Sequence, residues 1–281
     1  MADPAGTADL HSHSTASDGA LGPEDVVALA AERGVGTLAL TDHDTLAGLP
    51  AAAAAAAAHG VRLVFGVELS VRVPHGSMHL VGYFEEMAPP ALMGWLEELR
   101  AGRVSRAERI VGRLGDLGVG VEMADVLARA GGPVGRPHIA DAMVAAGHAR
   151  DRQDAFERYL GDGRQAWVPT QGLGPTESIA LVAEAGGASA LAHPGSLRLD
   201  GQRLGSAVQR LTARGLGGIE VHRPEHHPER RRAYRRLAAR FGLVATGGSD
   251  FHHLDGTLRP GDTGDPPLPA DAIDRLLATR A

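Results

Sequence analysis

Short apolar runs alternate with amphipathic segments over much of this chain. The runs predict strands that follow an opening strand near Asp9. These predicted strands are residues 36–41, 61–67, 78–83, 188–192, 218–221 and 243–247. Segments with apolar positions three or four apart predict helices between them, at 23–33, 51–59, 176–185, 204–214, 229–241 and 271–278. This alternation indicates a mainly parallel sheet.

The pattern changes between about Glu85 and Val168. This stretch is charged and helical in spacing, and its predicted helices are 95–113, 123–130, 139–147 and 152–160. We therefore divide the chain into the first part of a barrel (1–84), a helical insertion that caps it (85–170) and the second part of the barrel (171–281).

Polar residues gather where the predicted strands end. In a barrel all these carboxyl ends meet at one mouth, whereas an open doubly wound sheet brings together only the strands near its switch point. The predicted fold is therefore α/β, a barrel with a helical insertion.

The opening stretch Asp9–Gly19 contains a His-x-His pair, His11 and His13. In an extended segment both imidazoles leave from the same face, so they can reach one cation. Asp18 adds an oxygen ligand in the following loop. A His-x-His pair alone is weak evidence, but later strand ends offer further ligands.

Imidazoles and carboxylates dominate this set of candidate ligands. Its nine members are His11, His13, Asp18, His43, Glu68, His79, His193, Asp250 and His252. Nitrogen and oxygen ligation without sulfur suits Mn²⁺, and also Zn²⁺ or Fe²⁺. Nine ligands are too many for one ion, so we expect two or three divalent ions, with Glu68 as a bridge.

Composition narrows the chemistry further. The chain of 281 residues has no Cys and no Lys, which excludes thiolate metal sites, Schiff bases and a carbamylated-lysine metal bridge. Its net charge of −6 gives no basic field for long nucleic acid. No apolar run approaches the roughly 20 residues that span a bilayer, and residues 1–8 do not resemble a secretory signal. We expect a cytoplasmic protein that does not bind membranes; oligomeric state is not indicated.

Five motifs resemble, in order, those of the polymerase and histidinol phosphatase (PHP) superfamily. They are Asp9-Leu10-His11-Ser12-His13 with Asp18-Gly19, Thr41-Asp42-His43-Asp44, Gly66-Val67-Glu68, His193-Pro194-Gly195 and Gly248-Ser249-Asp250-Phe251-His252. The resemblance implies a distorted (β/α)₇ TIM-like barrel with a trinuclear metal centre.

The resemblance also divides the ligands among three sites. It implies one site with His11, His13, Glu68 and Asp250, a second with Asp18, His43 and His252, and a third with Glu68, His79 and His193. The histidine that the histidinol phosphatase branch often has at position 18 is absent, because this chain has Ser17-Asp18-Gly19. The resemblance is therefore closer to the branch that acts on nucleotides.

That branch implies a metal-dependent phosphoesterase. The substrate would be a small nucleotide: a nucleoside 3′,5′-bisphosphate, a nucleoside monophosphate or a short 5′-phosphorylated RNA. A hydroxide that bridges the metals would attack phosphorus in line. Histidinol phosphate is the alternative substrate. Two less favoured protein classes stay open, an amidohydrolase and a non-catalytic metal-binding module.

Residues outside the metal set could bind the phosphate. Arg136 could clamp it with two donors, His138 lies beside Arg136 in the same loop, and His222 could donate to the phosphate or to the leaving oxygen. We expect Asp9 and Asp42 to fix histidine tautomers.

One further charged segment needs an interpretation. The arginines of 230–236 alternate with apolar positions, so we interpret them as the solvated side of a packed helix rather than as a nucleic-acid surface.

Overall fold

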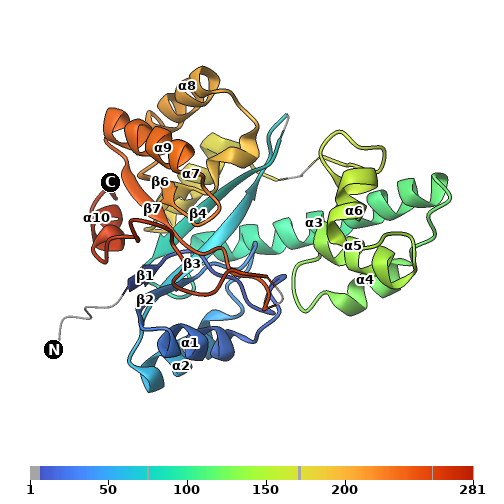
Figure 1. Cartoon of the computed structure of the whole chain (residues 1–281), viewed down its shortest axis with the longest axis horizontal. Helices are drawn as coiled ribbons and strands as arrows, with labels where there is room; N and C mark the ends of the chain where they lie inside the picture. The colour runs from blue at the N-terminus through green and yellow to red at the C-terminus, as the bar shows by residue number, and fades with distance from the viewer. Residues whose placement is uncertain (1–6, 75, 170–171, 255, 281) are drawn as a thin grey trace.

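A computed structural model describes residues 7–74, 76–169, 172–254 and 256–280 (Figure 1). Its centre is a seven-stranded sheet whose strands follow one another in chain order. The strands are β1 (Thr7–Asp9), β2 (Val35–Leu40), β3 (Arg62–Val71), β4 (Met78–Phe84), β5 (Ala188–Leu191), β6 (Gly218–His222) and β7 (Val244–Gly247). The predicted strands coincide with β2 to β7, and β3 extends further than expected.

Contacts between the first and last strands nearly close the sheet into a barrel. The amide of Leu10 donates to the Gly247 carbonyl (3.2 Å), and the amide of His13 donates to the Phe251 carbonyl (3.0 Å). Gly248 allows this approach, because a Cβ there would lie 2.4 Å from the Cβ of His11. The structure is therefore a seven-stranded α/β barrel, as predicted.

One strand runs against the others. β4 pairs antiparallel with both β3 and β5, whereas the remaining neighbours are parallel. The connection from Val71 to Met78 is too short for a crossover, so it can only return the chain antiparallel. As a result, the beginning of β4 lies at the same end of the barrel as the ends of the parallel strands.

Six helices accompany the strands of the barrel. They are α1 (Pro23–Glu32), α2 (Leu49–His59), α7 (Pro175–Glu184), α8 (Gly201–Thr212), α9 (Pro228–Phe241) and α10 (Ala272–Leu277). Proline occupies the first turn of α1, α2, α7 and α9, where its missing N–H costs no hydrogen bond. Only Val26, Val27 and Ala30 of α1 are buried, so this helix packs through one side.

The segment between β4 and α7 forms a separate group of helices, on the right of Figure 1. They are α3 (Pro90–Asp116), α4 (Met123–Arg129), α5 (Arg136–Ala145), α6 (Arg152–Ala155) and a π-helical turn, η1 (Phe156–Leu160). We call residues 85–170 the insertion. Its own buried cluster includes Ile110, Leu114 and Ile139.

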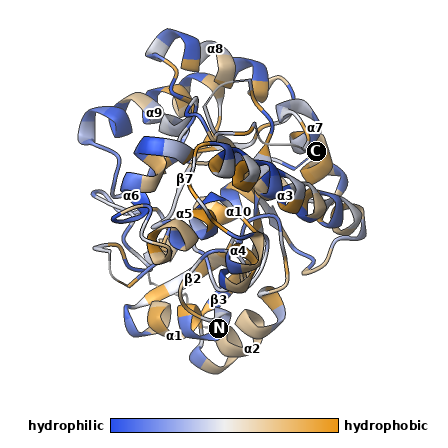
Figure 2. Ribbon diagram, turned by 90° about the vertical axis from the view of Figure 1, so that its right-hand side faces the viewer, coloured by the Kyte–Doolittle hydropathy of each residue, from blue (hydrophilic) through white to orange (hydrophobic). Residues whose placement is uncertain are grey.

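Helix α3 belongs to two hydrophobic clusters. Leu92, Leu96 and Leu99 pack with residues of the barrel, whereas Ile110 and Leu114 pack within the insertion. Hydrophilic and hydrophobic residues alternate along its ribbon in Figure 2. With 27 residues the helix is about 40 Å long. In the described part of the chain, no helix combines the length and apolarity needed to cross a bilayer.

Tyr83 provides a test of barrel closure. Its side chain is fully buried, and its hydroxyl donates to the carbonyl of Leu10 (2.8 Å), immediately before His11. We expect Tyr83→Phe to lower the free energy of unfolding in urea by about 1–2 kcal/mol, because a buried carbonyl loses its partner. The control Tyr159→Phe, in an exposed hydrogen bond with Arg158, should change it by less than about 0.5 kcal/mol. Equal losses in both variants would contradict this view of Tyr83.

Candidate metal centre

The barrel mouth collects the nine candidate ligands from distant parts of the sequence. Their side chains contact one another as ion pairs or ring pairs. His79 joins them because β4 is antiparallel: it pairs with Ser70 of β3, on the face that also carries Glu68. The structure thus brings all nine together.

Glu68 lies at the centre of the cluster and is only 1% exposed. Its Oε2 is 3.2 Å from ring nitrogens of His11, His13 and His43. Its Oε1 is 2.8 Å from His79 Nδ1 and 2.7 Å from His193 Nε2. One buried carboxylate therefore faces five imidazoles, with a different set on each oxygen.

Glu68 Oε2 and three other ligand atoms form a compact group of four. His11 Nε2 and His13 Nε2 are 3.1 Å apart, and they lie 3.3 and 3.1 Å from Asp250 Oδ1. Four atoms placed tetrahedrally at about 2.0–2.1 Å from a metal ion would be about 3.3–3.4 Å apart. The separations in this group therefore fit a single ion.

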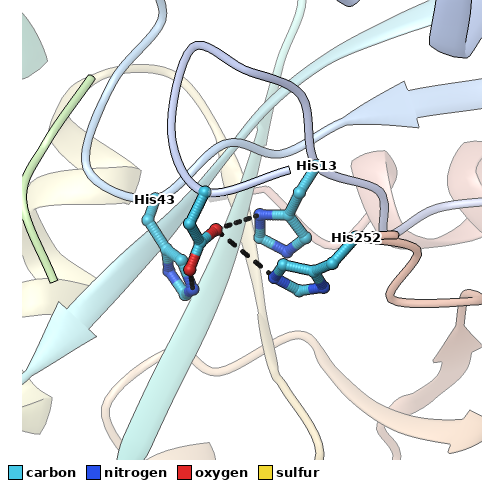
Figure 3. A group of neighbouring side chains, drawn as sticks. His13, His43 and His252 are labelled. Atoms are coloured by element: carbon cyan, nitrogen blue, oxygen red, sulfur yellow. Dashed lines mark ion pairs between the residues drawn. The ribbon is translucent and has the colours of Figure 1, made fainter. Parts of the chain in front are cut away.

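A second group surrounds Asp18. The imidazoles of His13, His43 and His252 pair with its carboxylate. Figure 3 shows these three rings gathered around one carboxylate. The Asp18 oxygens lie 3.4 Å from His252 Nε2 and 3.9 Å from both His13 Nδ1 and His43 Nε2. We call Asp18, His43 and His252 the Asp18 group.

The electrostatics of both groups suit cations. Burial raises the pKa of Glu68, but the charges of His43, His11 and His79 outweigh burial and hold this pKa well below its usual range. Burial likewise raises the pKa of Asp18, and His43 and His252 lower it by more. Both carboxylates are therefore anions at neutral pH.

Unpaired buried atoms support the same interpretation. His13 Nδ1, His43 Nδ1 and Asp250 Oδ1 make no hydrogen bond of acceptable geometry among the described residues, although His43 Nδ1 lies 3.2 Å from Glu68 Oε2 and Asp250 Oδ1 lies 3.1 Å from His13 Nε2. Burial lowers the pKa of His43 to about 3 despite Glu68 and Asp18, so its ring is neutral and offers a lone pair. Buried polar atoms without partners are costly unless a ligand satisfies them. The residues present fit divalent cations.

Hydrogen bonds fix the tautomers of three ligand histidines. His11 Nδ1 donates to Glu220 Oε1 (2.6 Å), and His252 Nδ1 donates to the Asp250 carbonyl (2.8 Å). His193 Nδ1 donates to Ser196 Oγ (3.2 Å), which itself donates to the Ser77 carbonyl. In the neutral ring each bond leaves Nε2 without a proton, so Nε2 is the atom that can bind metal.

The expectation for Asp9 and Asp42 is wrong. Asp9 accepts backbone amides of His11, Ser249 and Gly261, and Asp42 accepts from Ser14 and Ser17. Neither carboxylate accepts a hydrogen bond from an imidazole among the described residues. They hold the ligand loops through amides and hydroxyls, because loop N–H groups buried at the mouth need acceptors.

Two residues that the sequence did not single out support the ligands. Glu220 accepts from His11 and also from the amide of His193 (2.5 Å). Burial raises the pKa of Glu220, but His11, Arg223 and His193 together lower it to about 2. Arg223 lies 2.6 Å from Asp250 Oδ2. In the sequence, the signal that could have pointed to Glu220 was its position two residues before the end of β6.

The backbone is strained at the centre. Asp44, His193 and Asp250 have φ values of 51°, 22° and 53°, which residues other than glycine rarely adopt. Two of them are candidate ligands and the third follows His43. Such strain persists only where surrounding contacts enforce it, and it is typical of functional sites.

A cleft between the mouth and the insertion adjoins the ligands. Asp18, His43 and His79 line it on the barrel side. Three arginines of the insertion, Arg103, Arg106 and Arg136, also line it. Burial lowers the pKa of Arg106 to about 9, and repulsion from Arg136 and Arg103 adds to this effect. Crowded cations beside a metal centre favour an anionic ligand.

The remaining predicted residues differ in placement. Arg136 lines the cleft, donates to the Leu160 carbonyl (3.2 Å) and lies over the Phe156 ring. His138 is buried, and its Nδ1 accepts the amide of Gly135 (3.0 Å). His222 donates from Nδ1 to the Pro266 carbonyl (3.0 Å). Among the described residues, His222 makes no side-chain hydrogen bond, ion pair or ring contact with the nine ligands.

Comparisons with known proteins agree with this geometry. The model of the PHP domain matches residues 9–111. A 3′,5′-nucleoside bisphosphate phosphatase of Chromobacterium violaceum is 36% identical over 246 residues, which cover 87% of this chain and 86% of the relative. This chain belongs to the PHP family.

Two further PHP relatives extend the comparison. The 5′-3′ exoribonuclease Rnm of Salmonella typhimurium is 37% identical over 247 residues, which cover 87% of this chain and 84% of that protein. A crystal structure from Bifidobacterium adolescentis, described as a candidate metal-dependent phosphoesterase, is 32% identical with a TM-score of 0.86. The superposition covers 100% of this PHP chain and 98% of that one.

Glu220 offers a test of the support around His11. We expect Glu220→Gln to weaken Mn²⁺ binding by about 10- to 100-fold, because the acceptor that fixes the His11 tautomer loses its charge. Isothermal titration of the metal-free protein would measure the change. Glu229→Gln, on the exposed side of α9, is the control. An affinity within twofold of the control would show that Glu220 does not support the ligand.

Proposed function

We propose that this protein is a metal-dependent phosphoesterase that hydrolyses phosphate monoesters of small nucleotides. The observation that supports this most is the juxtaposition of Glu68, which faces five imidazoles, with a cleft lined by three arginines. The cluster around Glu68 suits cations and the arginines of the cleft suit anions, so together they suit a phosphate ester held against metal ions.

We propose that two to three divalent ions, Mn²⁺ foremost, bind the nine ligands. His11, His13, Glu68 and Asp250 would hold one ion, the Asp18 group a second, and Glu68 with His79 and His193 a third. Zn²⁺ or Fe²⁺ would suit the same nitrogen and oxygen ligands. When bound, such ions lower the pKa of water and stabilise negative charge on phosphate oxygens.

The residues of the chain would position the substrate. Arg136 is charged at neutral pH although burial lowers its pKa, and its guanidinium can donate two parallel hydrogen bonds to a phosphate. Arg106, buried beside it without an acidic partner among the described residues, would add a second positive charge. We propose that these arginines bind the phosphate groups that the metal ions do not.

We propose that His138 and His222 both act through Nε2, His138 as a hydrogen-bond donor and His222 as a proton acceptor. Because His138 Nδ1 accepts the Gly135 amide, its neutral ring carries the proton on Nε2, which can donate to a substrate. His222 has only Nε2 available, because Nδ1–H is used by Pro266. Burial lowers the pKa of His222, so the neutral ring would accept a proton through Nε2 rather than donate one.

The insertion would complete the site as a cap. We propose that residues 85–170 cover a barrel formed by 1–84 and 171–281, because the three arginines of the cleft all come from this segment. A cap that excludes water strengthens the interaction between guanidinium and phosphate.

The substrate class follows from these charges and from the relatives. A cleft with three arginines suits an ester that carries a second phosphate, such as a nucleoside 3′,5′-bisphosphate. A nucleoside monophosphate or a short 5′-phosphorylated RNA would present the same groups. We propose these three classes, with the bisphosphate as the first to test.

Phosphate release tests the proposal directly. We expect the protein loaded with Mn²⁺ to release phosphate from a nucleoside 3′,5′-bisphosphate and to lose this activity with a chelator. Histidinol phosphate serves as the comparison substrate. If the metal-loaded protein released no phosphate from the bisphosphate, the monophosphate or short RNA, the proposal would be wrong.

The variant Arg136→Ala tests whether Arg136 binds a phosphate group of the substrate. We expect KM for the bisphosphate to rise by about tenfold or more, since a charge-assisted pair of hydrogen bonds contributes about 1.5–3 kcal/mol. The value of kcat should change less, because the arginine binds a phosphate that does not react. Arg129→Ala, in an exposed part of the insertion, is the control. An unchanged KM would remove Arg136 from the binding site.

A further inference from the structure

The insertion touches the barrel mouth beside each member of the Asp18 group. Its contacts fall on Thr15 and Ala16, shortly before Asp18, on Asp44, next to His43, and on His253, next to His252. These three loops are far apart in the sequence. All three carry a member of the Asp18 group, and two of them also carry His13 and Asp250.

The first contact is between two backbones. A Cβ on Gly132 would lie 1.7 Å from the carbonyl oxygen of Ala16, and one on Gly131 would lie 2.6 Å from that of Thr15. Only glycine allows the insertion to approach this closely. The loop between His13 and Asp18 is therefore confined from outside the barrel.

The second contact is a buried ion pair. Arg103 Nε of α3 donates to Asp44 Oδ2 (2.5 Å), and its Nη2 donates to Ser70 Oγ (2.7 Å). Asp44 Oδ1 accepts the amide of Ser70 (2.8 Å). Asp44 has a positive φ, so the pair stabilises a backbone conformation that the residue would otherwise avoid.

The third contact uses an arginine that is itself held in place. Arg152 of α6 binds both oxygens of Asp141 on α5, each at 2.6 Å. Its third nitrogen, Nη1, donates to His253 Nε2. A guanidinium fixed in this way has little freedom left, so it can position the loop that carries His252.

The other ligands depend mainly on the barrel. Glu220 of β6 orients His11, and Arg223, just after β6, pairs with Asp250. Glu68 lies within β3, between its paired neighbours β2 and β4. The insertion also reaches loops that carry these ligands. Arg103 donates to Ser70 Oγ, two residues beyond Glu68. Asp162 accepts the amide of Gly76 (3.1 Å), near His79, and lies 3.9 Å from Arg198, in the segment after His193.

We propose that the insertion sets the metal affinity of the Asp18 group, with Arg152 as a positioning residue. This inference rests on the proposed metal centre and goes beyond it. The ion held by His11, His13, Glu68 and Asp250 belongs to the barrel. The ion of the Asp18 group binds tightly only while the insertion is seated on the mouth.

Arg152→Ala tests this division, with Arg150→Ala as the matched control. Arg150 lies in the same part of the insertion and pairs with Asp154, also in the insertion. Isothermal titration of the metal-free proteins with Mn²⁺ would give the number and affinity of the sites. We expect Arg152→Ala to weaken one site by about tenfold or more and to leave the others within twofold of the control.

Manganese anomalous scattering from crystals of the loaded protein would locate the affected ion. We expect reduced occupancy at the Asp18 group alone in Arg152→Ala. Asp141→Asn, which leaves Arg152 present but loosens it, should shift the same site in the same direction by a smaller factor. This second variant keeps the test valid if Arg152→Ala unfolds.

Three results would overturn the proposal. Affinities equal to those of Arg150→Ala would show that Arg152 does not position the group. A uniform weakening of every site would show a general structural role instead. A wild-type protein that binds Mn²⁺ at no site would remove the metal centre itself, whereas the first two results leave the proposed phosphoesterase intact.

Discussion

A buried carboxylate that faces five imidazoles is the constraint that organises this structure. Glu68 is 1% exposed, and no arginine among the described residues pairs with it. Taking a carboxylate out of water costs several kcal/mol unless charges or hydrogen bonds compensate. Five imidazoles surround it. Burial lowers the pKa of His11 and of His13, but carboxylates that include Glu68 and Asp250 outweigh burial and raise both pKa values. The mouth of the barrel therefore concentrates negative charge that protons or metal ions on these imidazoles must balance.

The barrel satisfies this constraint through its topology. Parallel strands bring their carboxyl ends to one mouth, and an antiparallel β4 adds a residue from the beginning of a strand. The sequence allowed the fold, the order of elements and the candidate ligands to be predicted, because short apolar runs ended repeatedly in histidines and carboxylates. The direction of β4 was not predicted, although the short 72–77 connection contained that information.

Supporting residues were harder to predict than ligands. Glu220 lies inside an apolar strand, and the sequence pattern assigned it no role, so its contact with His11 identifies its role. Asp9 lies two residues before His11 and Asp42 directly before His43, but their carboxylates reach backbone amides and serine hydroxyls instead of imidazoles. Contacts between residues more than 200 positions apart cannot be inferred from local pattern.

Helix α3 limits how the insertion can move relative to the barrel. Leu92, Leu96 and Leu99 pack in the core of the barrel, whereas Ile110 and Leu114 pack in the core of the insertion. Helix α3 is continuous between these two cores, so it contains no hinge there. Hinges are usually a few loop residues that absorb backbone rotation, and an unbroken helix offers none. On this side the insertion is therefore held rigidly against the barrel. If the insertion covers the site as proposed, the cleft would open by small tilting and side-chain rearrangement rather than by a hinged motion of the whole insertion.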